Sequence, residues 1–220
     1  MTLPREDVIA GLPAELEDFE QLVRSLDAAE LATPSRCGRW SAGDVAAHVI
    51  GQIADVTAGR FDGLGTPEVT QRQVDERRGR SAAELADELA LATKSAGDLL
   101  VVFDDDAWSG PSPAGTGTLG AGVEALWYDA FLHADDIRAA IGRPSGPPRG
   151  VPVAISHLCD VLTEQGHAPM TLAFDGVPEF TVSGGGDSRI TGDAMEFVYV
   201  ATGRADPSTL GLDETVNVYR

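Results

Sequence analysis

Hydrophobic residues recur every three or four positions through the first two thirds of the chain, which is the period of an amphipathic α-helix. The first such stretch covers residues 5–29, and its apolar positions are Val8, Leu12, Leu16, Phe19, Leu22, Val23 and Leu26. Pro34 and the turn-like sequence at residues 37–39 then interrupt the pattern. We therefore predict a first helix over residues 5–29.

Capping residues mark the starts of a second and a third helix. Ser41 supplies an N-cap hydroxyl ahead of the acidic Asp44, so a second helix begins there and ends near residue 59. Ser81 and Glu84 have the spacing of a capping box, which starts a third helix.

A fourth helix is predicted over residues 119–141. It follows a stretch, residues 104–117, whose composition is that of a loop, and it ends before Gly142 and Pro144. Four helices with polar connections are typical of an antiparallel bundle.

The hydrophobic period changes after about residue 150. We predict a short helix over 153–165, strands over 171–174 and 179–182, a helix over 193–202 and a last strand over 215–219. The fold class is therefore mainly α with a small α+β C-terminal part, and the predicted domains are residues 1–148 and 149–220.

Composition narrows the class of protein. The chain has 16 Lys and Arg against 35 Asp and Glu, a net charge of −19, and 43% hydrophobic residues, as in a folded soluble protein. Such a charge repels phosphate backbones and anionic lipids, so we expect no nucleic-acid and no membrane partner. The N-terminal sequence has neither the basic start nor the apolar core of a signal peptide, and we expect a cytoplasmic protein.

Two predicted helices carry residues that could bind a metal ion. Asp129 and His133 are four positions apart on the fourth helix, and His48 lies beside apolar residues of the second. An acid and an imidazole are costly to bury unless they are paired or bind a metal. His48, Asp129 and His133 together would form a three-ligand site with an open coordination position. Such a site suits zinc and equally suits ferrous iron. The alternative is an exposed Asp–His pair on a solvated helix face.

The remaining candidates give weaker signals. Cys37 could be a nucleophile, but the sequence pairs it with no base, and a small, partly buried thiol is favoured. His157 and Cys159 are two positions apart and would point in different directions on a helix. Trp40, Trp108 and Trp127 are core residues or pocket walls.

Three segments resemble a known family. They are residues 37–51 (CGRWSAGDVAAHVIG), residues 129–142 (DAFLHADDIRAAIG) and the C-terminal stretch 201–213. They are similar to motifs of the mycothiol-dependent maleylpyruvate isomerase family, which belongs to the DinB-like metal-binding helical bundles. The resemblance implies a DinB-like four-helix bundle followed by a small sterol-carrier-like domain.

The same resemblance implies roles for individual residues. His48, Asp129 and His133 would bind a divalent metal, usually zinc, with iron or nickel as alternatives. Members often have glutamate where this chain has the shorter Asp129, so either the helix approaches the metal more closely or a water bridges the gap. Arg204 matches an arginine of the small domain that would steady a substrate carboxylate.

Three further residues would support this site. Trp40 and Trp127 would form walls of the substrate pocket. Asp136 would orient a metal ligand as a hydrogen-bond acceptor, or pair with Arg138 instead.

The implied function is a metal-dependent enzyme that uses mycothiol or a similar thiol. It would catalyse cis–trans isomerisation or S-transfer on a small electrophile such as a carboxylate-bearing one, as a monomer or a homodimer. One alternative is a bundle that binds a small molecule without catalysis. Another is a different metal-dependent reaction, that of a cyclase, hydrolase or oxygenase, on the same scaffold.

Overall fold

The computed structural model describes residues 3–115 and 117–220. Within it the chain forms two compact units, Pro4–Pro147 and Pro148–Arg220. The structure confirms a mainly helical protein with a small sheet near the C-terminus.

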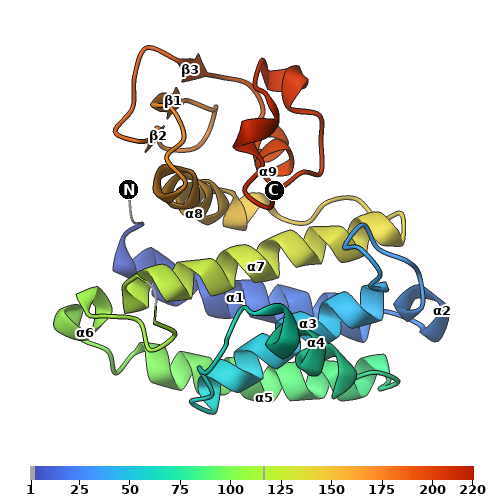
Figure 1. The fold of residues 1–220 in the computed structure, drawn as a ribbon. Helices are drawn as coiled ribbons and strands as arrows, with labels where there is room; N and C mark the ends of the chain where they lie inside the picture. Colours follow the sequence, from blue (N-terminus) through green and yellow to red (C-terminus); the bar gives the residue numbers. More distant parts are fainter. Residues whose placement is uncertain (1–2, 116) are drawn as a thin grey trace. The chain divides into compact units, whose positions relative to one another are not determined.

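Four long helices build the first unit: α1 (Arg5–Arg24), α3 (Ala42–Thr57), α5 (Ala82–Leu100) and α7 (Leu119–Ala140). Both α1 and α3 pack against α5 and α7, so the four helices enclose one core (Figure 1). The apolar stripe of the first helix is buried in this core, with Val8, Leu16, Phe19 and Val23 completely inaccessible.

The first predicted helix is two helices in the structure. α1 ends at Arg24, and α2 (Ala28–Leu31) begins after Asp27. Asp27 and Glu30 form a capping box, which satisfies backbone N–H groups at a new helix start and thereby ends the continuous helix.

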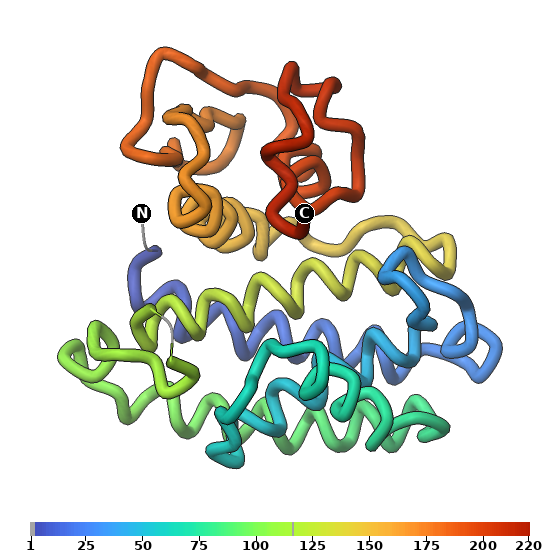
Figure 2. The backbone as a smooth tube through the Cα atoms, in the orientation of Figure 1, coloured from blue at the N-terminus to red at the C-terminus, as the bar shows by residue number. Residues whose placement is uncertain are grey.

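The connection between α3 and α5 contains a helix that the sequence pattern did not predict. α4 (Pro67–Asp75) is capped by Thr66, has a proline at its first position and packs against α3. It carries the chain back along the bundle, so α5 runs in the same direction as α3, whereas α7 runs opposite to both (Figure 2). The prediction of a purely antiparallel bundle is therefore wrong at this pair, and also at α1 and α7, which run in the same direction as each other (Figure 1). A short helix, α6 (Asp105–Ser109), also forms within the expected loop.

The second unit contains α8 (Val151–Glu164), which packs against α9 (Ala194–Ala201) and β2. Its sheet has the order β2-β1-β3. β1 (Met170–Leu172) pairs antiparallel with β2 (Phe180–Val182) and parallel with β3 (Arg189–Ile190), a strand that the sequence pattern did not predict. Single 3-10 turns are η1 (Pro148–Gly150), η2 (Pro207–Leu210) and η3 (Glu214–Val216).

The predicted last strand at 215–219 is wrong. Asp213 accepts a hydrogen bond from the backbone N–H of Thr215 and starts the 3-10 turn η3. The N–H of Val218 then bonds to the carbonyl of Ala201, so the segment is tied to the end of α9 instead of to the sheet.

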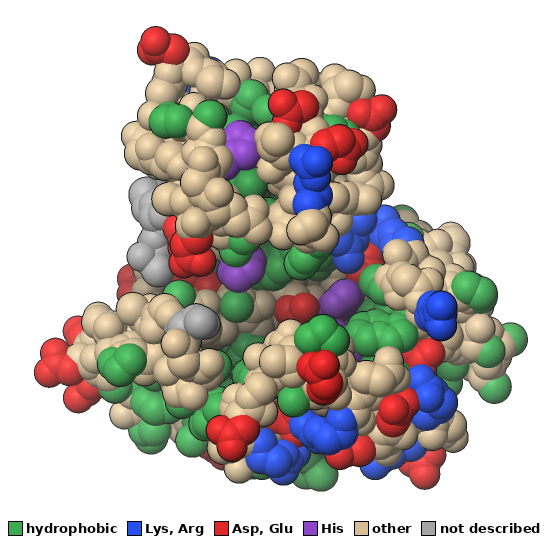
Figure 3. All heavy atoms as spheres, viewed as in Figure 1, with side chains coloured by type: hydrophobic (Ala, Val, Ile, Leu, Met, Phe, Trp, Pro, Cys, Tyr) green, Lys and Arg blue, Asp and Glu red, His purple; other side chains and the backbone are tan. Residues whose placement is uncertain are grey.

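None of the helices in the described part of the chain is both long and apolar enough to cross a membrane. Acidic and basic side chains are mixed over the face seen in Figure 3.

Candidate metal centre

Helices α3 and α7 bring His48, Asp129 and His133 together. The two helices run antiparallel and pack against each other. Nε2 of His48 lies 3.4 Å from Oδ2 of Asp129, and Nε2 of His133 lies 3.5 Å from Oδ1 of Asp129. The side chains are 8%, 20% and 13% exposed, so the Asp–His pair does not belong to a solvated helix face.

These separations fit a shared metal ion. They exceed the usual N–H···O distance of about 2.7–3.2 Å. Two ligands about 2.0–2.1 Å from a tetrahedral zinc ion lie about 3.3 Å apart, close to both observed distances. The three donor atoms all lie within 4.8 Å of one another. Although Asp129 is shorter than glutamate, its carboxylate reaches both imidazoles.

The orientation of His48 is set by Gln73 of α4. Oε1 of Gln73 lies 3.2 Å from Nδ1 of His48, and Nε2 of Gln73 donates to Asp55 at 2.8 Å. Because the amide nitrogen is committed to Asp55, the amide oxygen faces the imidazole, and Nδ1 of His48 is the donor. Its Nε2 is then free to bind a metal, as in metal sites whose histidines are oriented by a hydrogen bond from the other nitrogen.

Asp55 anchors this arrangement from within α3. It is 1% exposed, and Arg60 and Arg72 donate to its two oxygens at 2.8 and 2.6 Å. Burial alone would raise the pKa of Asp55, but hydrogen bonds from Gln73, Arg60 and Arg72, with the charge of Arg72, outweigh burial and hold this pKa below its usual value. The carboxylate is therefore ionised and keeps Gln73 in place.

His133 contacts Asp136 through its other ring nitrogen. Nδ1 of His133 lies 2.8 Å from Oδ2 of Asp136, which is completely buried. Arg36 donates to Asp136 at 2.5 Å and to the neighbouring Asp135 at 2.6 Å. The carboxylate accepts a hydrogen bond from Nδ1–H, so Nε2 of His133 is also directed toward Asp129.

The acid between the two histidines attracts a cation. Burial alone would lower the pKa of His48, but the charge of Asp129 and the acceptor oxygens of Asp129 and Gln73 beside the ring outweigh burial, and the net effect raises this pKa. A proton and a divalent metal ion would compete for Nε2 of His48, beside the Asp129 carboxylate.

The loop before α3 places two more residues beside the histidines. The ring of Trp40 lies 5.3 Å from the ring of His48, between centroids. Sγ of Cys37 lies 3.0 Å from Oδ2 of Asp136 and 3.8 Å from Nδ1 of His133. The sequence paired Cys37 with no base, whereas the structure brings it to a histidine and a carboxylate.

Two other predicted residues, Trp127 and Arg204, make contacts within their own units. Trp127 faces α1: it is 5% exposed, its indole N–H donates to Glu15 at 3.3 Å, and its ring fills the space beside Gly11. Arg204 belongs to the second unit, where its guanidinium donates to the carbonyl of Thr202 at 3.3 Å.

Three residues of this centre were missed in the sequence: Arg36, Asp55 and Gln73. Arg36 directly precedes the first recognised motif, and Asp55 is two turns beyond His48 on the same helix. No local pattern marked Gln73, since no helix was predicted between residues 59 and 81.

Comparisons with known proteins identify the family. The model of the mycothiol maleylpyruvate isomerase N-terminal domain matches residues 12–138, which is more than half of the chain. The chain belongs to this family. Two solved structures are similar in fold: a mycothiol-dependent maleylpyruvate isomerase (17% identity, TM-score 0.69) and a histidine-to-alanine mutant of such an isomerase (17% identity, TM-score 0.67). Each match covers 96% of this chain and 96% of the other. No curated protein sequence matches this chain.

This member of the mycothiol maleylpyruvate isomerase family has a small cavity close to the histidines. The cavity measures about 200 Å³ and is lined by Gln52 and Val56 of α3, by Phe61 and Leu64 of the following loop, and by residues of α7 that include Gly122 and Leu126. Gln52 lies one turn after His48, and Leu126 lies nearly one turn before Asp129, so the cavity begins about 6 Å along the helices from the ligands.

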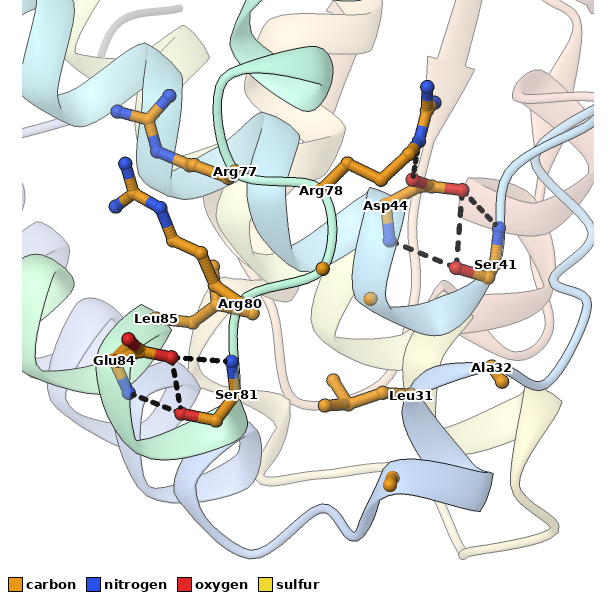
Figure 4. Close-up of a pocket in the computed structure, with 13 residues that line it drawn as sticks. Leu31, Ala32, Ser41, Asp44, Arg77, Arg78, Arg80, Ser81, Glu84 and Leu85 are labelled. Atoms are coloured by element: carbon orange, nitrogen blue, oxygen red, sulfur yellow. Dashed lines mark hydrogen bonds and ion pairs between the residues drawn. The ribbon is translucent and has the colours of Figure 1, made fainter.

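A second cavity, of about 510 Å³, lies at the N-terminal ends of α3 and α5 (Figure 4). Arginine side chains and two helix N-termini would favour an anion there. The described contacts already use these groups: Ser41–Asp44 and Ser81–Glu84 are closed capping boxes, and the arginines at 77, 78 and 80 form ion pairs with neighbouring carboxylates. The metal centre is therefore the better candidate for the functional site.

Proposed function

We propose that this chain is a metal-dependent enzyme that uses a low-molecular-weight thiol of the mycothiol type. Its reaction would be cis–trans isomerisation, or S-transfer, on a small electrophile with an activated double bond. The observation that carries the proposal is the convergence of His48, Asp129 and His133, with both imidazole Nε2 atoms directed to one place.

The donor set fits a divalent metal. Two neutral imidazoles and one carboxylate suit zinc first, with iron or nickel as the alternatives. Three protein ligands leave a coordination position for a thiol. A metal ion held there would supply Lewis acidity, which deprotonates a coordinating thiol.

The residues around the ligands prepare this site. Gln73 and Asp136 each accept a hydrogen bond from an Nδ1–H group, which directs both Nε2 atoms toward Asp129. The ring of Trp40 lies beside the His48 imidazole, 5.3 Å between centroids and tilted by 41°.

The proposed chemistry balances without an oxidant. The thiolate adds to one carbon of the double bond, and the π electrons move onto the conjugated carbonyl. Rotation about the resulting single bond, followed by expulsion of the thiolate, gives the trans isomer. If a proton reaches the carbon next to the carbonyl first, the thioether is the product, which is S-transfer.

We also propose that Arg204 binds a carboxylate of the substrate. The C-terminal unit would be a sterol-carrier-like domain. Arg204→Met is then expected to raise KM for a carboxylate-bearing substrate more than it lowers kcat. An unchanged KM would remove Arg204 from the mechanism.

The first experiment is metal analysis of untagged protein by plasma mass spectrometry. We expect about one divalent metal ion per chain, lost in His48→Ala, Asp129→Ala and His133→Ala. His167→Ala, a substitution in the other unit, is the matched control and keeps its metal. Metal retained by all three ligand variants would overturn the assignment.

Catalytic activity is then measured on the protein preparations used for metal analysis. The metal-loaded protein is mixed with thiol and maleate-type electrophiles, and products are followed by proton NMR. No turnover after metal loading would favour the bundle that binds a small molecule without catalysis.

A further inference from the structure

We propose that the 200 Å³ cavity between α3 and α7 is the specificity pocket of this enzyme, and that it takes an uncharged, apolar substituent of the electrophile. The proposal rests on the proposed function for the reacting end of the substrate. It states which substituent of the electrophile the cavity selects: an apolar group, and not a second carboxylate of the substrate.

The lining of the cavity has no charge. Its larger apolar side chains are Val56, Phe61, Leu64, Leu119, Val123 and Leu126, and no charged residue or His is among the described residues that line it. A carboxylate placed there would lose its hydration without a compensating cation, which is costly. The net charge of −19 opposes a second negative charge further.

The cavity is placed to hold a substituent while the other end reacts. Gln52 follows His48 by one turn of α3, and Ala125 and Leu126 precede Asp129 by one turn of α7. A chain of about four carbon atoms spans the roughly 6 Å of one helical turn. The cavity is therefore within reach of a double bond held at the metal centre.

Gln52 adds one polar feature. Its Oε1 is buried and has no hydrogen-bond partner among the described residues. A buried carbonyl oxygen without a donor is destabilising, and a ligand N–H or O–H would relieve this cost. An amide next to the apolar tail is then a better fit than an ester.

The test of specificity uses three maleate electrophiles with the thiol and the metal-loaded enzyme. They are maleate, its monomethyl ester and its monobutyl ester. Burial of three further methylene groups predicts a kcat/KM about 50-fold higher for the butyl than for the methyl ester. Maleate is expected to be the poorest substrate, and a preference for maleate would overturn the proposal.

Gly122→Leu fills the cavity. A Cβ on Gly122 would have Ser112 Oγ at 3.4 Å as its nearest neighbour, so the larger side chain can enter without meeting the backbone. We expect the butyl-to-methyl ratio to fall to near one. Gly97→Leu is the matched control, because a Cβ there meets nothing within 4 Å and Gly97 lies on α5, outside the cavity. An unchanged ratio in Gly122→Leu would overturn the assignment.

A binding measurement separates this proposal from the proposed function. N-phenyl-1-naphthylamine is neutral, apolar and fluorescent in apolar sites, and it carries one N–H. Saturable binding that is lost in Gly122→Leu and kept in Gly97→Leu supports the pocket even if no electrophile is turned over. Binding that Gly122→Leu leaves unchanged, or no binding at all, contradicts it.

Gln52→Leu tests the polar feature. The wild type should prefer N-butylmaleamic acid over monobutyl maleate by about 10-fold, the value of one hydrogen bond to a buried acceptor. The variant should lose this preference while keeping the preference for butyl over methyl. An amide preference that survives in Gln52→Leu would remove Gln52 from the pocket.

Discussion

Oε1 of Gln73 lies 3.2 Å from Nδ1 of His48, although the two residues are 25 positions apart and lie on different helices. The contact decides which nitrogen of the imidazole carries the proton. It thereby makes α4, the helix that the sequence pattern did not predict, part of the candidate metal centre.

Gln73→Leu should weaken metal binding without unfolding the bundle. Loss of the acceptor lets His48 rotate and change tautomer, and partners of this kind are worth about 10–100-fold in metal affinity. Competition with a chromophoric chelator measures the affinity. Gln71→Leu, on the same helix and hydrogen-bonded only to the exposed Asp75 among the described contacts, is the control. Equal affinities in the two variants would contradict the role of Gln73.

Gly51 controls how closely α4 approaches α3. A Cβ on Gly51 would lie 2.5 Å from Cβ of Gln73, closer than real contacts allow. Gly51→Ala should therefore push α4 outward, destabilise the protein by about 1–3 kcal/mol and reduce metal content. Urea unfolding and metal analysis on the same samples measure both effects.

At Gly97 the same glycine-to-alanine substitution should have the opposite effect on stability. This helical glycine has open space at its Cβ, so alanine should stabilise α5 by about 0.5–1 kcal/mol. If Gly51→Ala also stabilised the protein, the close approach of α4 would not be a constraint.

The sequence predicted those parts of the fold that have strong local signals. The caps at Ser41 and Ser81 mark real helix starts, and the apolar stripes of α1, α3, α5 and α7 are long enough to show their period. α4 has only Val69 and Val74 as apolar residues, and β3 has only two residues, so neither element shows a period. The direction of α5 depended on α4 and was missed with it.

In the candidate site, too, the sequence predicted the residues with a local signal and missed the others. His48, Asp129 and His133 could be proposed because each lies in a recognisable helical motif. The anchoring contacts could not, because they join residues far apart in the chain: Arg36 reaches Asp136 across 100 positions, and Gln73 reaches Asp55 across 18. Trp127 was expected at the pocket because an indole suits a pocket wall, but Gly11 on α1 leaves room for its ring in the core.

The stability of the helical unit should fall with acid through Asp55. Its pKa is held below the usual value in the folded protein, against about 3.9 in an unfolded chain. The stabilisation is therefore complete above the unfolded pKa and is lost as pH falls through the folded pKa. Urea unfolding at falling pH should show a constant advantage of the wild type over Asp55→Asn above the unfolded pKa, and a shrinking advantage below it. Asp75→Asn, an exposed partner of Arg78, should leave the pH dependence unchanged.

The two cysteines should differ sharply in reactivity. Burial raises the pKa of Cys159 to about 12, and this residue is completely inaccessible, whereas Cys37 is half-buried beside His133 and Asp136. Because the thiolate is the reactive form, iodoacetamide at pH 8 should label one thiol per folded chain, at Cys37. Mass spectrometry should find no label on folded Cys37→Ser and two labels on the wild type unfolded in guanidinium. Rapid labelling of Cys159 in the folded protein would contradict its burial in α8.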